Sequence, residues 1–178
     1  MPLVRDETLD VAVVQRTLAA VGPGLKFRAL YRDRMVIACR RGHPLRGARS
    51  PRELADARWL GFNAPGSGSW LEKAFPAVGL AFPRRFTMCE SFAFAFELMA
   101  RSDALMPVPA PVFAGPLNRG LLVEIPLKEP LPPFVLGLCT RADAQLTSLS
   151  TALARAVADL IKNYPRNRRK QLQRRGPS

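Results

Sequence analysis

Two junctions between a strand and a loop, close together in the chain, most constrain what this sequence can fold into. The first is YRDRMVIACRRGHPL at residues 31–45, an apolar strand pattern that two arginines, a glycine and Pro44 interrupt. The second is WLGFNAPGSGSW at residues 59–70, a short apolar strand that runs into a loop of small residues and the start of a helix. Strands that alternate with helices favour mostly parallel sheets with helices on their faces. The layout predicts an α/β protein that holds a small ligand between two lobes.

The composition is that of a globular protein of one domain or two small lobes. The chain has 178 residues, of which 48% are hydrophobic and 23% are charged. No apolar run approaches the roughly 20 residues that a membrane-spanning helix needs. The first ten residues, MPLVRDETLD, carry acids where a signal peptide needs an apolar segment, so we expect a cytoplasmic protein. Cys39, Cys89 and Cys139 are odd in number and widely spaced, which favours reduced thiols over a metal site.

The net charge of +13 is unevenly distributed, because residues 165–178 contribute +6 with no acid and the rest of the chain keeps +7. This segment has no apolar periodicity, so we expect a disordered basic tail. Two interpretations remain open for it. One is a solubilising extension, and the other is weak, salt-sensitive contact with nucleic acid.

Several helix starts can be read from capping residues. Ser50, Pro51 and Glu53 form a capping box with proline at the first helical position. Ser67 or Ser69 is expected to cap a second helix that Pro76 ends early, and Ser91 a third helix whose aromatic stripe points to the core. The last helix starts near Thr147. It is expected to place one apolar face inward, made of Leu149, Leu153, Val157, Leu160 and Ile161.

The strand patterns suggest two lobes built from three pieces of chain. Residues 9–14 form a nearly continuous apolar run, typical of a strand covered on both faces. Proline-containing breaks near residues 39–44 and 127–133 are candidate crossings between lobes. The sequence therefore predicts one lobe from residues 1–44 and 127–164, a second from 45–126, and the tail from 165.

The loop after Phe62 has the chemistry of an anion site. Free backbone N–H groups at a helix start favour an anion, glycines allow close approach, and serine hydroxyls donate and accept. An ordinary turn between a strand and a helix, without a ligand, explains the same residues. His43, the only histidine, precedes a proline and has no evident nucleophile or carboxylate partner, so a structural role is favoured. The sequence offers no candidate catalytic residue, metal ligand or cofactor motif.

These segments together resemble the effector-binding domain of LysR-type bacterial transcriptional regulators. LDVAVV is similar to the family's "ELDLAIV" strand, and RDRMVIACRRGHPL to its strand that ends in His-Pro-Leu. SPRELADARWLGFNAPGS resembles the helix, strand and loop that follow, and MCESFAFAFELMARSDALMPVP the strand, helix and strand that end in "LLP". The resemblance covers nearly all of residues 8–163, and its specificity comes from the order and spacing of the segments.

The resemblance implies a two-lobe fold like that of type 2 periplasmic binding proteins, with the first lobe truncated at its N-terminal side. It implies a small, anionic effector between the lobes and a homo-oligomer, either dimer or tetramer. It also implies contact with operator DNA only through a winged helix-turn-helix that this chain lacks, and no contact with membranes. The expected effector-binding residues are Val14, Gln15, Phe62, Asn63, Pro65, Gly66, Ser67, Gly68, Ser69, Glu90, Ser91 and Pro107.

Two other classes of function compete with this one. A free-standing solute-binding protein of the same fold would need an export signal, which the first residues do not provide. An enzyme would need a matched acid and base, and the sequence offers no such pair. The sequence therefore favours a ligand-sensing regulatory domain that is not an enzyme.

Overall fold

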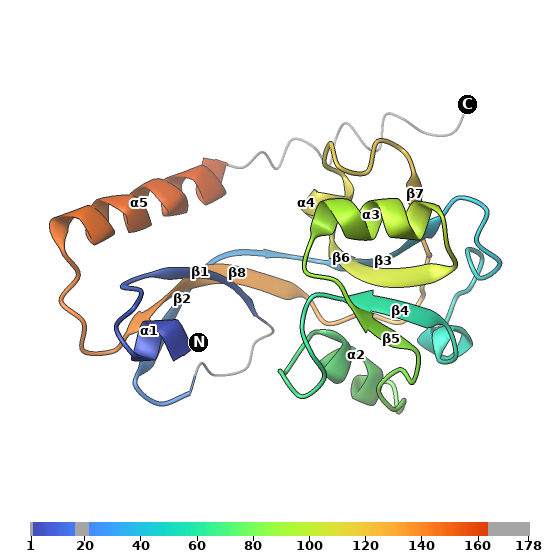
Figure 1. Cartoon of the computed structure of the whole chain (residues 1–178), viewed down its shortest axis with the longest axis horizontal. Helices are drawn as coiled ribbons and strands as arrows, with labels where there is room; N and C mark the ends of the chain where they lie inside the picture. The colour runs from blue at the N-terminus through green and yellow to red at the C-terminus, as the bar shows by residue number, and fades with distance from the viewer. Residues whose placement is uncertain (1, 17–21, 164–178) are drawn as a thin grey trace. The chain divides into compact units, whose positions relative to one another are not determined.

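The computed structural model describes residues 2–16 and 22–163, which Figure 1 shows in colour. The chain forms two compact units. Unit 1 contains residues 1–32 and 134–178, and unit 2 contains residues 33–133. Within the described ranges, no helix is both long and apolar enough to cross a membrane.

Unit 1 contains a three-stranded sheet to which both ends of the chain contribute. The strand order is β1 (Ala12–Arg16), β8 (Phe134–Arg141) and β2 (Leu25–Asp33), with β8 in the middle. β1 and β8 are antiparallel, in a register that pairs Ala12 with Cys139. This pairing confirms that the two ends of the chain share one sheet. The described residues of this unit also form the helices α1 (Pro2–Arg5) and α5 (Ser148–Asn163).

Unit 2 contains a five-stranded sheet in the order β5 (Phe86–Met88), β4 (Arg58–Gly61), β6 (Ala104–Pro109), β3 (Met35–Arg40) and β7 (Leu122–Glu124). β4 is parallel to both β5 and β6, whereas β3 is antiparallel to both β6 and β7. The expectation of mostly parallel sheets is therefore wrong for β1 and β8 and for β3. A connection long enough for a helical crossover permits a parallel pair but does not require one, so alternation of strands and helices in the sequence does not fix the strand direction.

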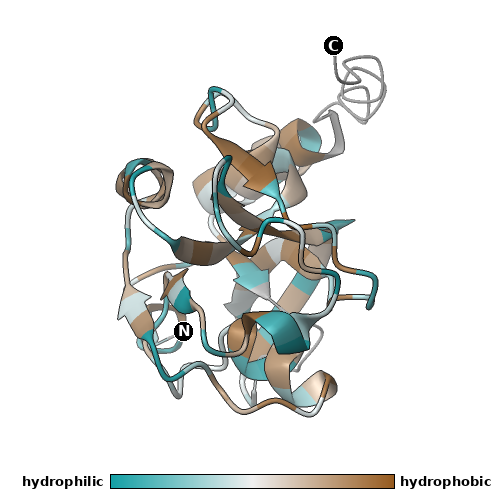
Figure 2. Cartoon of the chain, turned by 90° about the vertical axis from the view of Figure 1, so that its right-hand side faces the viewer, coloured by the Kyte–Doolittle hydropathy of each residue, from teal (hydrophilic) through white to brown (hydrophobic). Residues whose placement is uncertain are grey.

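The core of unit 2 lies between this sheet and its helices. They are the 3-10 helix η1 (Pro51–Leu54) and the α-helices α2 (Leu71–Ala77), α3 (Phe92–Ala100) and α4 (Ala110–Phe113). Buried residues of β3, β4 and β6 pack against Ala95, Phe96 and Met99 of α3, so the aromatic stripe is part of the core, as predicted. The indole N–H of Trp59 donates to the carbonyl of Leu54 at 3.1 Å. Figure 2 shows hydrophobic stretches in the strands and helices, which also carry hydrophilic residues.

Two helix starts, those of η1 and α3, have the predicted caps, and at α2 the predicted Ser69 lies one residue before the N-cap Trp70. Ser50 and Glu53 form a reciprocal capping box at η1, which also has Pro51 at its first turn. The Ser91 hydroxyl accepts from the N–H of Phe94 at 3.3 Å and caps α3. At α2 the Ser69 hydroxyl accepts from the N–H of Glu72 at 3.4 Å, and Pro76 lies in the last turn.

The boundaries between the units differ from the predicted ones. The first lies at Asp33 rather than after Pro44, because Met35–Arg40 pairs with strands of unit 2 on both sides. The second lies at Phe134 rather than at Leu127. Residues 127–133 stay with unit 2 because the Ser50 hydroxyl bonds Glu129 at 2.6 Å and the Trp70 indole bonds the carbonyl of Pro132 at 2.7 Å. The predicted tail lies outside the described residues.

The last helix presents its leucines differently from the prediction. Leu149, Leu153 and Leu160 are 80%, 59% and 72% exposed, whereas the buried residues of α5 are Ala154 and Ala158. Similarly, the strand predicted to be covered on both faces leaves Val13 50% exposed. Unit 1 therefore has apolar side chains that its own described residues do not cover.

Cys39 and Cys139 are fully buried and Cys89 is partly buried, and all three are free thiols. Burial raises the pKa of the Cys39 thiol to about 11, and the nearby Arg40 and Arg46 lower it only partly. Because the thiolate is the reactive form, Cys39 is chemically inert at neutral pH.

Gly137 of β8 provides a sharp test of the packing in unit 1. A Cβ atom at this position would overlap the backbone carbonyl oxygen of Arg28 and the Phe27 ring. We expect Gly137→Ala to lower the free energy of unfolding by about 1–3 kcal/mol, because backbone atoms must move apart. Gly47→Ala is the matched control, since a Cβ there meets nothing within 4 Å. Urea denaturation followed by circular dichroism measures both. Equal stability of the two variants would contradict the described β2–β8 packing.

Candidate ligand-binding site

The predicted contact residues of unit 2 converge at one edge of the five-stranded sheet. β4 and β5 are parallel and end together, with Gly61 beside Met88. β6 runs parallel to β4 with Leu105 beside Trp59, so Pro107 lies level with Gly61 two residues further along. The carboxyl ends of these strands carry residues 62–69, Glu90 with Ser91, and Pro107. Ligands of open α/β sheets bind outside such carboxyl ends.

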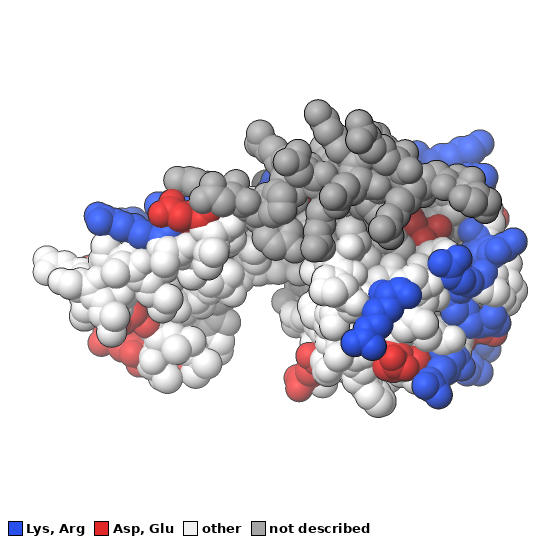
Figure 3. Space-filling view, turned by 90° about the horizontal axis from the view of Figure 1, so that it is seen from above, with Lys and Arg blue, Asp and Glu red and all other residues white. Residues whose placement is uncertain are grey.

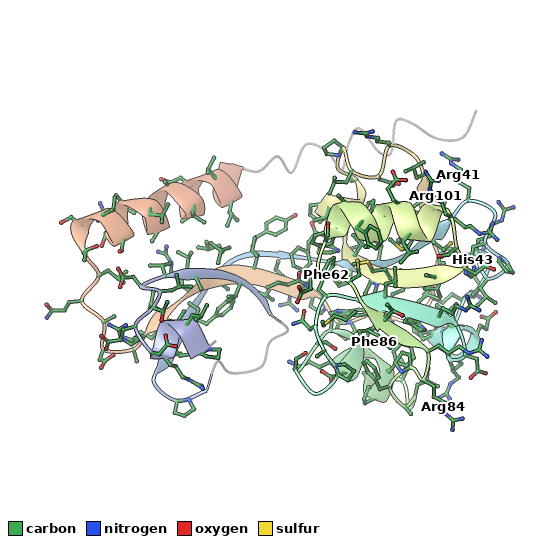
Figure 4. The ribbon with its side chains drawn as sticks, viewed as in Figure 1. Arg41, His43, Phe62, Arg84, Phe86 and Arg101 are labelled. Carbon is green, nitrogen blue, oxygen red and sulfur yellow. The ribbon has the colours of Figure 1, made fainter. Side chains whose placement is uncertain are left out.

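Phe62 forms an apolar surface at this edge. Its ring centroid lies 4.0 Å from that of Phe92, the first residue of α3, with the two planes tilted by 51°. Both side chains are partly buried against the core of unit 2. Figure 4 labels Phe62 in its place beside α3. Phe92 was not among the predicted contacts, although its position directly after the Ser91 cap places it at the same edge.

Glu72 already occupies the backbone donors of the small-residue loop. Its carboxylate accepts from the N–H of Ser69 at 2.6 Å and from the N–H of Gly66. Burial alone would raise the pKa of Glu72. The hydrogen bonds from Gly66, Ser69 and Gly68 outweigh burial and hold the pKa below its ordinary value. The loop therefore binds an anionic group, and that group is the protein's own carboxylate.

Glu72 was not among the predicted contacts, although its spacing in the sequence indicates its role. Ser69-Trp70-Leu71-Glu72 has the S-x-x-E spacing of a capping box, in which the acid returns to the backbone at the helix start. The structure has both hydrogen bonds of that motif, from the Glu72 N–H to the Ser69 hydroxyl and from the Ser69 N–H to the Glu72 carboxylate.

Gly66 and Gly68 have a conformational role in this loop. Their φ angles are +87° and +73°, which L side chains rarely adopt. Pro65, Asn63 and Ser67 are exposed, and Ser69 is half-buried. The loop thus presents the Asn63 amide and the Ser67 hydroxyl to solvent, while Glu72 occupies its backbone donors.

The remaining predicted contacts differ in what they can offer a ligand. Ser91 is exposed, and its hydroxyl can still donate although it accepts from Phe94. Glu90 is exposed, whereas Pro107 is buried within β6. In unit 1, Val14 packs against the buried cluster around Leu25 and Cys139, and Gln15 is exposed on the opposite face of β1.

His43 is a structural residue. It is only 3% exposed, and its Nδ1 accepts from the N–H of Leu45 at 2.9 Å. The described part of the chain contains no group of three His, Cys, Asp or Glu side chains placed to hold a metal ion. A hollow of about 420 Å³ in unit 1 is lined by none of the predicted contacts; its lining is Glu7, Thr8, Leu9, Asp10, Val11, Ser150 and Leu153.

The chain is similar to a curated transcriptional regulator. The chain is 30% identical over 137 residues to the HTH-type transcriptional regulator GalR of Pseudomonas putida, a match that covers 74% of this chain and 34% of that protein. The chain thus spans about a third of the length of this curated relative.

Solved structures agree with the described fold. One is the regulatory domain of MetR, a LysR family regulator from N. meningitidis, in a cysteine-to-serine double mutant. It matches with a TM-score of 0.70 and 18% identity, over 91% of this chain and 75% of that one. Another is the Synechocystis CcmR regulatory domain in complex with 2-PG. It matches with a TM-score of 0.70 and 16% identity, over 92% of this chain and 79% of that one.

The sequence profile of the LysR substrate binding domain matches residues 1–163, which is nearly the whole described chain. The two α/β units described above, and the TM-scores of the matched regulatory domains, agree with that assignment. The chain belongs to the LysR substrate-binding domain family.

Proposed function

We propose that this chain is the ligand-sensing part of a transcriptional regulator and binds a small effector at the carboxyl edge of β4, β5 and β6. The observation that carries the proposal is the convergence of Phe62, Ser67 and Ser91 at that edge, on three segments that are far apart in the sequence. An apolar wall with a few directed polar groups is the usual composition of a small-molecule site. The match to the LysR family profile supports the regulatory role.

The effector we propose is a small acid with an apolar part. Since Glu72 occupies the N–H groups of Gly66 and Ser69, the acid accepts instead from the side chains of Asn63, Ser67 and Ser91. The Phe62 ring packs against the apolar part. Val14 and Gln15 remain predicted contacts from unit 1.

Alanine substitutions test the location of this site. A thermal-shift screen of small carboxylic acids, with calorimetry on the hits, identifies a ligand to measure. Ser67→Ala and Ser91→Ala each remove a hydroxyl donor, so we expect each to weaken binding by about 1 kcal/mol, roughly fivefold, and by more for a charged acceptor. Ser148→Ala is the control, because it removes an exposed hydroxyl from α5 of unit 1. A ligand that binds all three variants like the parent chain would exclude this location.

The Glu72 hydrogen bonds predict a pH dependence of stability. Because the pKa of Glu72 is lowered in the folded chain, its contribution is fully present above the unfolded-state pKa and is lost as the pH falls through the folded-state pKa. The difference in unfolding midpoint between the parent chain and Glu72→Gln should therefore shrink from about pH 6 to about pH 3. Ser69→Ala, which removes one of the hydrogen-bond partners, should show a smaller pH dependence than the parent. A constant difference across this range would contradict the arrangement of the loop.

We propose further that the chain forms homo-oligomers through α5. Its exposed apolar residues Leu149, Leu153, Ala156 and Leu160 follow the 4-3-4 spacing of a helix that packs along another helix. A second copy of the same helix supplies a matching stripe, as in a two-fold symmetric pair. Exposed leucines of this number on one helix face favour association over exposure to water.

Light scattering on purified protein tests this association. The double variant Leu153→Glu, Leu160→Glu should be monomeric at tens of micromolar, whereas the parent chain should be at least a dimer, because charges in the stripe oppose helix packing. Arg155→Glu, on another exposed face of α5, is the control and should leave the assembly unchanged. A monomeric parent chain at the same concentration would refute the proposal.

A further inference from the structure

The edge of the unit 2 sheet opposite the candidate ligand site collects arginines from five strands. β4, β5 and β6 are parallel and begin at this edge, while β3, which is antiparallel to β6, ends there. β7 also begins there, because Leu122 pairs with Arg40 at the end of β3. The arginines at or next to these strand ends form what we call the arginine edge, namely Arg40, Arg41, Arg58, Arg84, Arg85, Arg101 and Arg119.

Hydrogen bonds connect neighbouring parts of this edge. The Arg41 Nε donates to the carbonyl of Gly120 at 2.6 Å, which brings Arg41 next to Arg119. Arg40 binds Asp103, the residue before β6, with 2.6 Å between the charged atoms. The carbonyl of Arg85 accepts from the N–H of Trp59 at 2.7 Å, so Arg85 lies beside the start of β4. The arginines are thus held at one end of the unit by the backbone of the sheet.

Acids neutralise only a small part of this charge. Asp103 is paired with Arg40, and Glu97 lies 3.4 Å from Arg101 one helical turn away. The pair with Glu97 is weak, because the Arg101 side chain is 81% exposed and solvent screens the interaction. Asp56 lies two residues before β4. Arg41, Arg58, Arg84, Arg85 and Arg119 are exposed and keep their charge available.

The figures show the same gathering of charge. In Figure 3 most of the blue side chains of unit 2 lie toward its right-hand side, with some red side chains beside them. In Figure 4, Arg41, Arg84 and Arg101 lie at the same end of unit 2, although they come from three different segments of the chain.

We propose that the arginine edge binds the phosphate backbone of duplex DNA without reading its sequence. Five strands at a spacing of about 4.8 Å make this edge roughly 19 Å wide. Duplex DNA carries one negative charge per about 1.7 Å of its axis, so several phosphates face an edge of this width. Arginine binds phosphate oxygens with its planar pair of donors, and every basic group at this edge is an arginine rather than a lysine.

A membrane surface fits these residues less well. Binding to a bilayer needs an apolar face beside the basic one. Of the large exposed hydrophobic residues of unit 2, Leu117 and Leu121 flank Arg119, while Met88 and Phe94 lie towards the opposite edge. Two leucines at 42% and 36% exposure are a small apolar area for insertion. The inference does not depend on the proposed effector, which would bind at the other edge.

The test keeps the whole chain and removes the contribution of its tail. The reference protein for this experiment, called the test parent, is the whole chain with the six basic residues of the tail replaced by glutamine. These residues are Arg166, Arg168, Arg169, Lys170, Arg174 and Arg175. On this background, Arg84→Gln, Arg85→Gln and Arg101→Gln form the edge variant. Arg28→Gln, Arg32→Gln and Arg155→Gln form the control, which has the same net charge and exposed positions outside unit 2.

Fluorescence anisotropy with a labelled random duplex, measured over a range of salt concentrations, gives the slope of log K against log salt. We expect the test parent to bind, and the edge variant to lose about 2.7 from the magnitude of that slope, roughly 0.9 for each phosphate contact. The control variant should retain the parent's slope. Circular dichroism verifies folding, and if the triple variant unfolds, Arg84→Gln alone should reduce the slope by about 0.9.

Three results would overturn the proposal. One is the absence of DNA binding by the test parent, which would assign any binding by the natural chain to its tail. A second is an equal loss of slope in the edge and control variants, which would indicate a response to net charge alone. The third is tighter binding to vesicles of phosphatidylserine than to DNA, lost in the edge variant, which would assign the surface to membranes.

Discussion

β4 is paired on both sides by parallel strands, and this pairing decides where the functional loops of unit 2 lie. Parallel neighbours end at the same edge of the sheet. The segments after β4, β5 and β6 therefore lie at one edge, although they are far apart in the sequence. Trp59 anchors β4, because its ring packs edge-on against Phe75 at 5.2 Å and its indole N–H bonds η1. The same pairing puts the starts of these strands, and the arginines beside them, at the opposite edge. One sheet thus separates an edge with hydroxyl and aromatic groups from an edge with positive charge.

Local patterns in the sequence predicted the local structure well. Ser50 and Ser91 cap helices because a hydroxyl at the right distance satisfies a free backbone N–H, and this depends on only a few neighbouring residues. The sharing of one sheet by the first and last strands was also predicted, from the two proline-containing breaks that divide the strand pattern into three pieces. The break at Pro44 was misinterpreted as a crossing between the units. A turn that stays within one unit and a segment that passes between units contain the same types of residue. Only the partners of Met35–Arg40 distinguish the two.

The shared position of the predicted contacts of unit 2 follows from the strand pairing, whereas their binding of an effector stays a prediction. Phe62, Ser67 and Ser91 were expected at one place because strand ends followed by small or capping residues indicate a binding edge. Glu72 accepts from backbone N–H groups of the loop because the chain folds back over one helical turn. Its spacing from Ser69 is that of a capping box, and this spacing indicated the contact. The exposure of the leucines on α5 could not be predicted from the sequence. Periodicity shows which residues share a face of a helix, but only tertiary contacts decide which face is covered.

The two prolines of β6 have a consequence for what can bind beside that strand. Pro107 pairs with Ile37 and Pro109 with Met35, while the N–H of Ala110 donates to Arg34 across the ladder. Residues 106, 108 and 110 therefore direct their N–H groups to β3, and positions 107 and 109 face the opposite side, where β4 ends level with Pro107. Proline has no N–H, so these two positions have no backbone donor. An extended peptide therefore cannot complete a regular ladder along this side of β6.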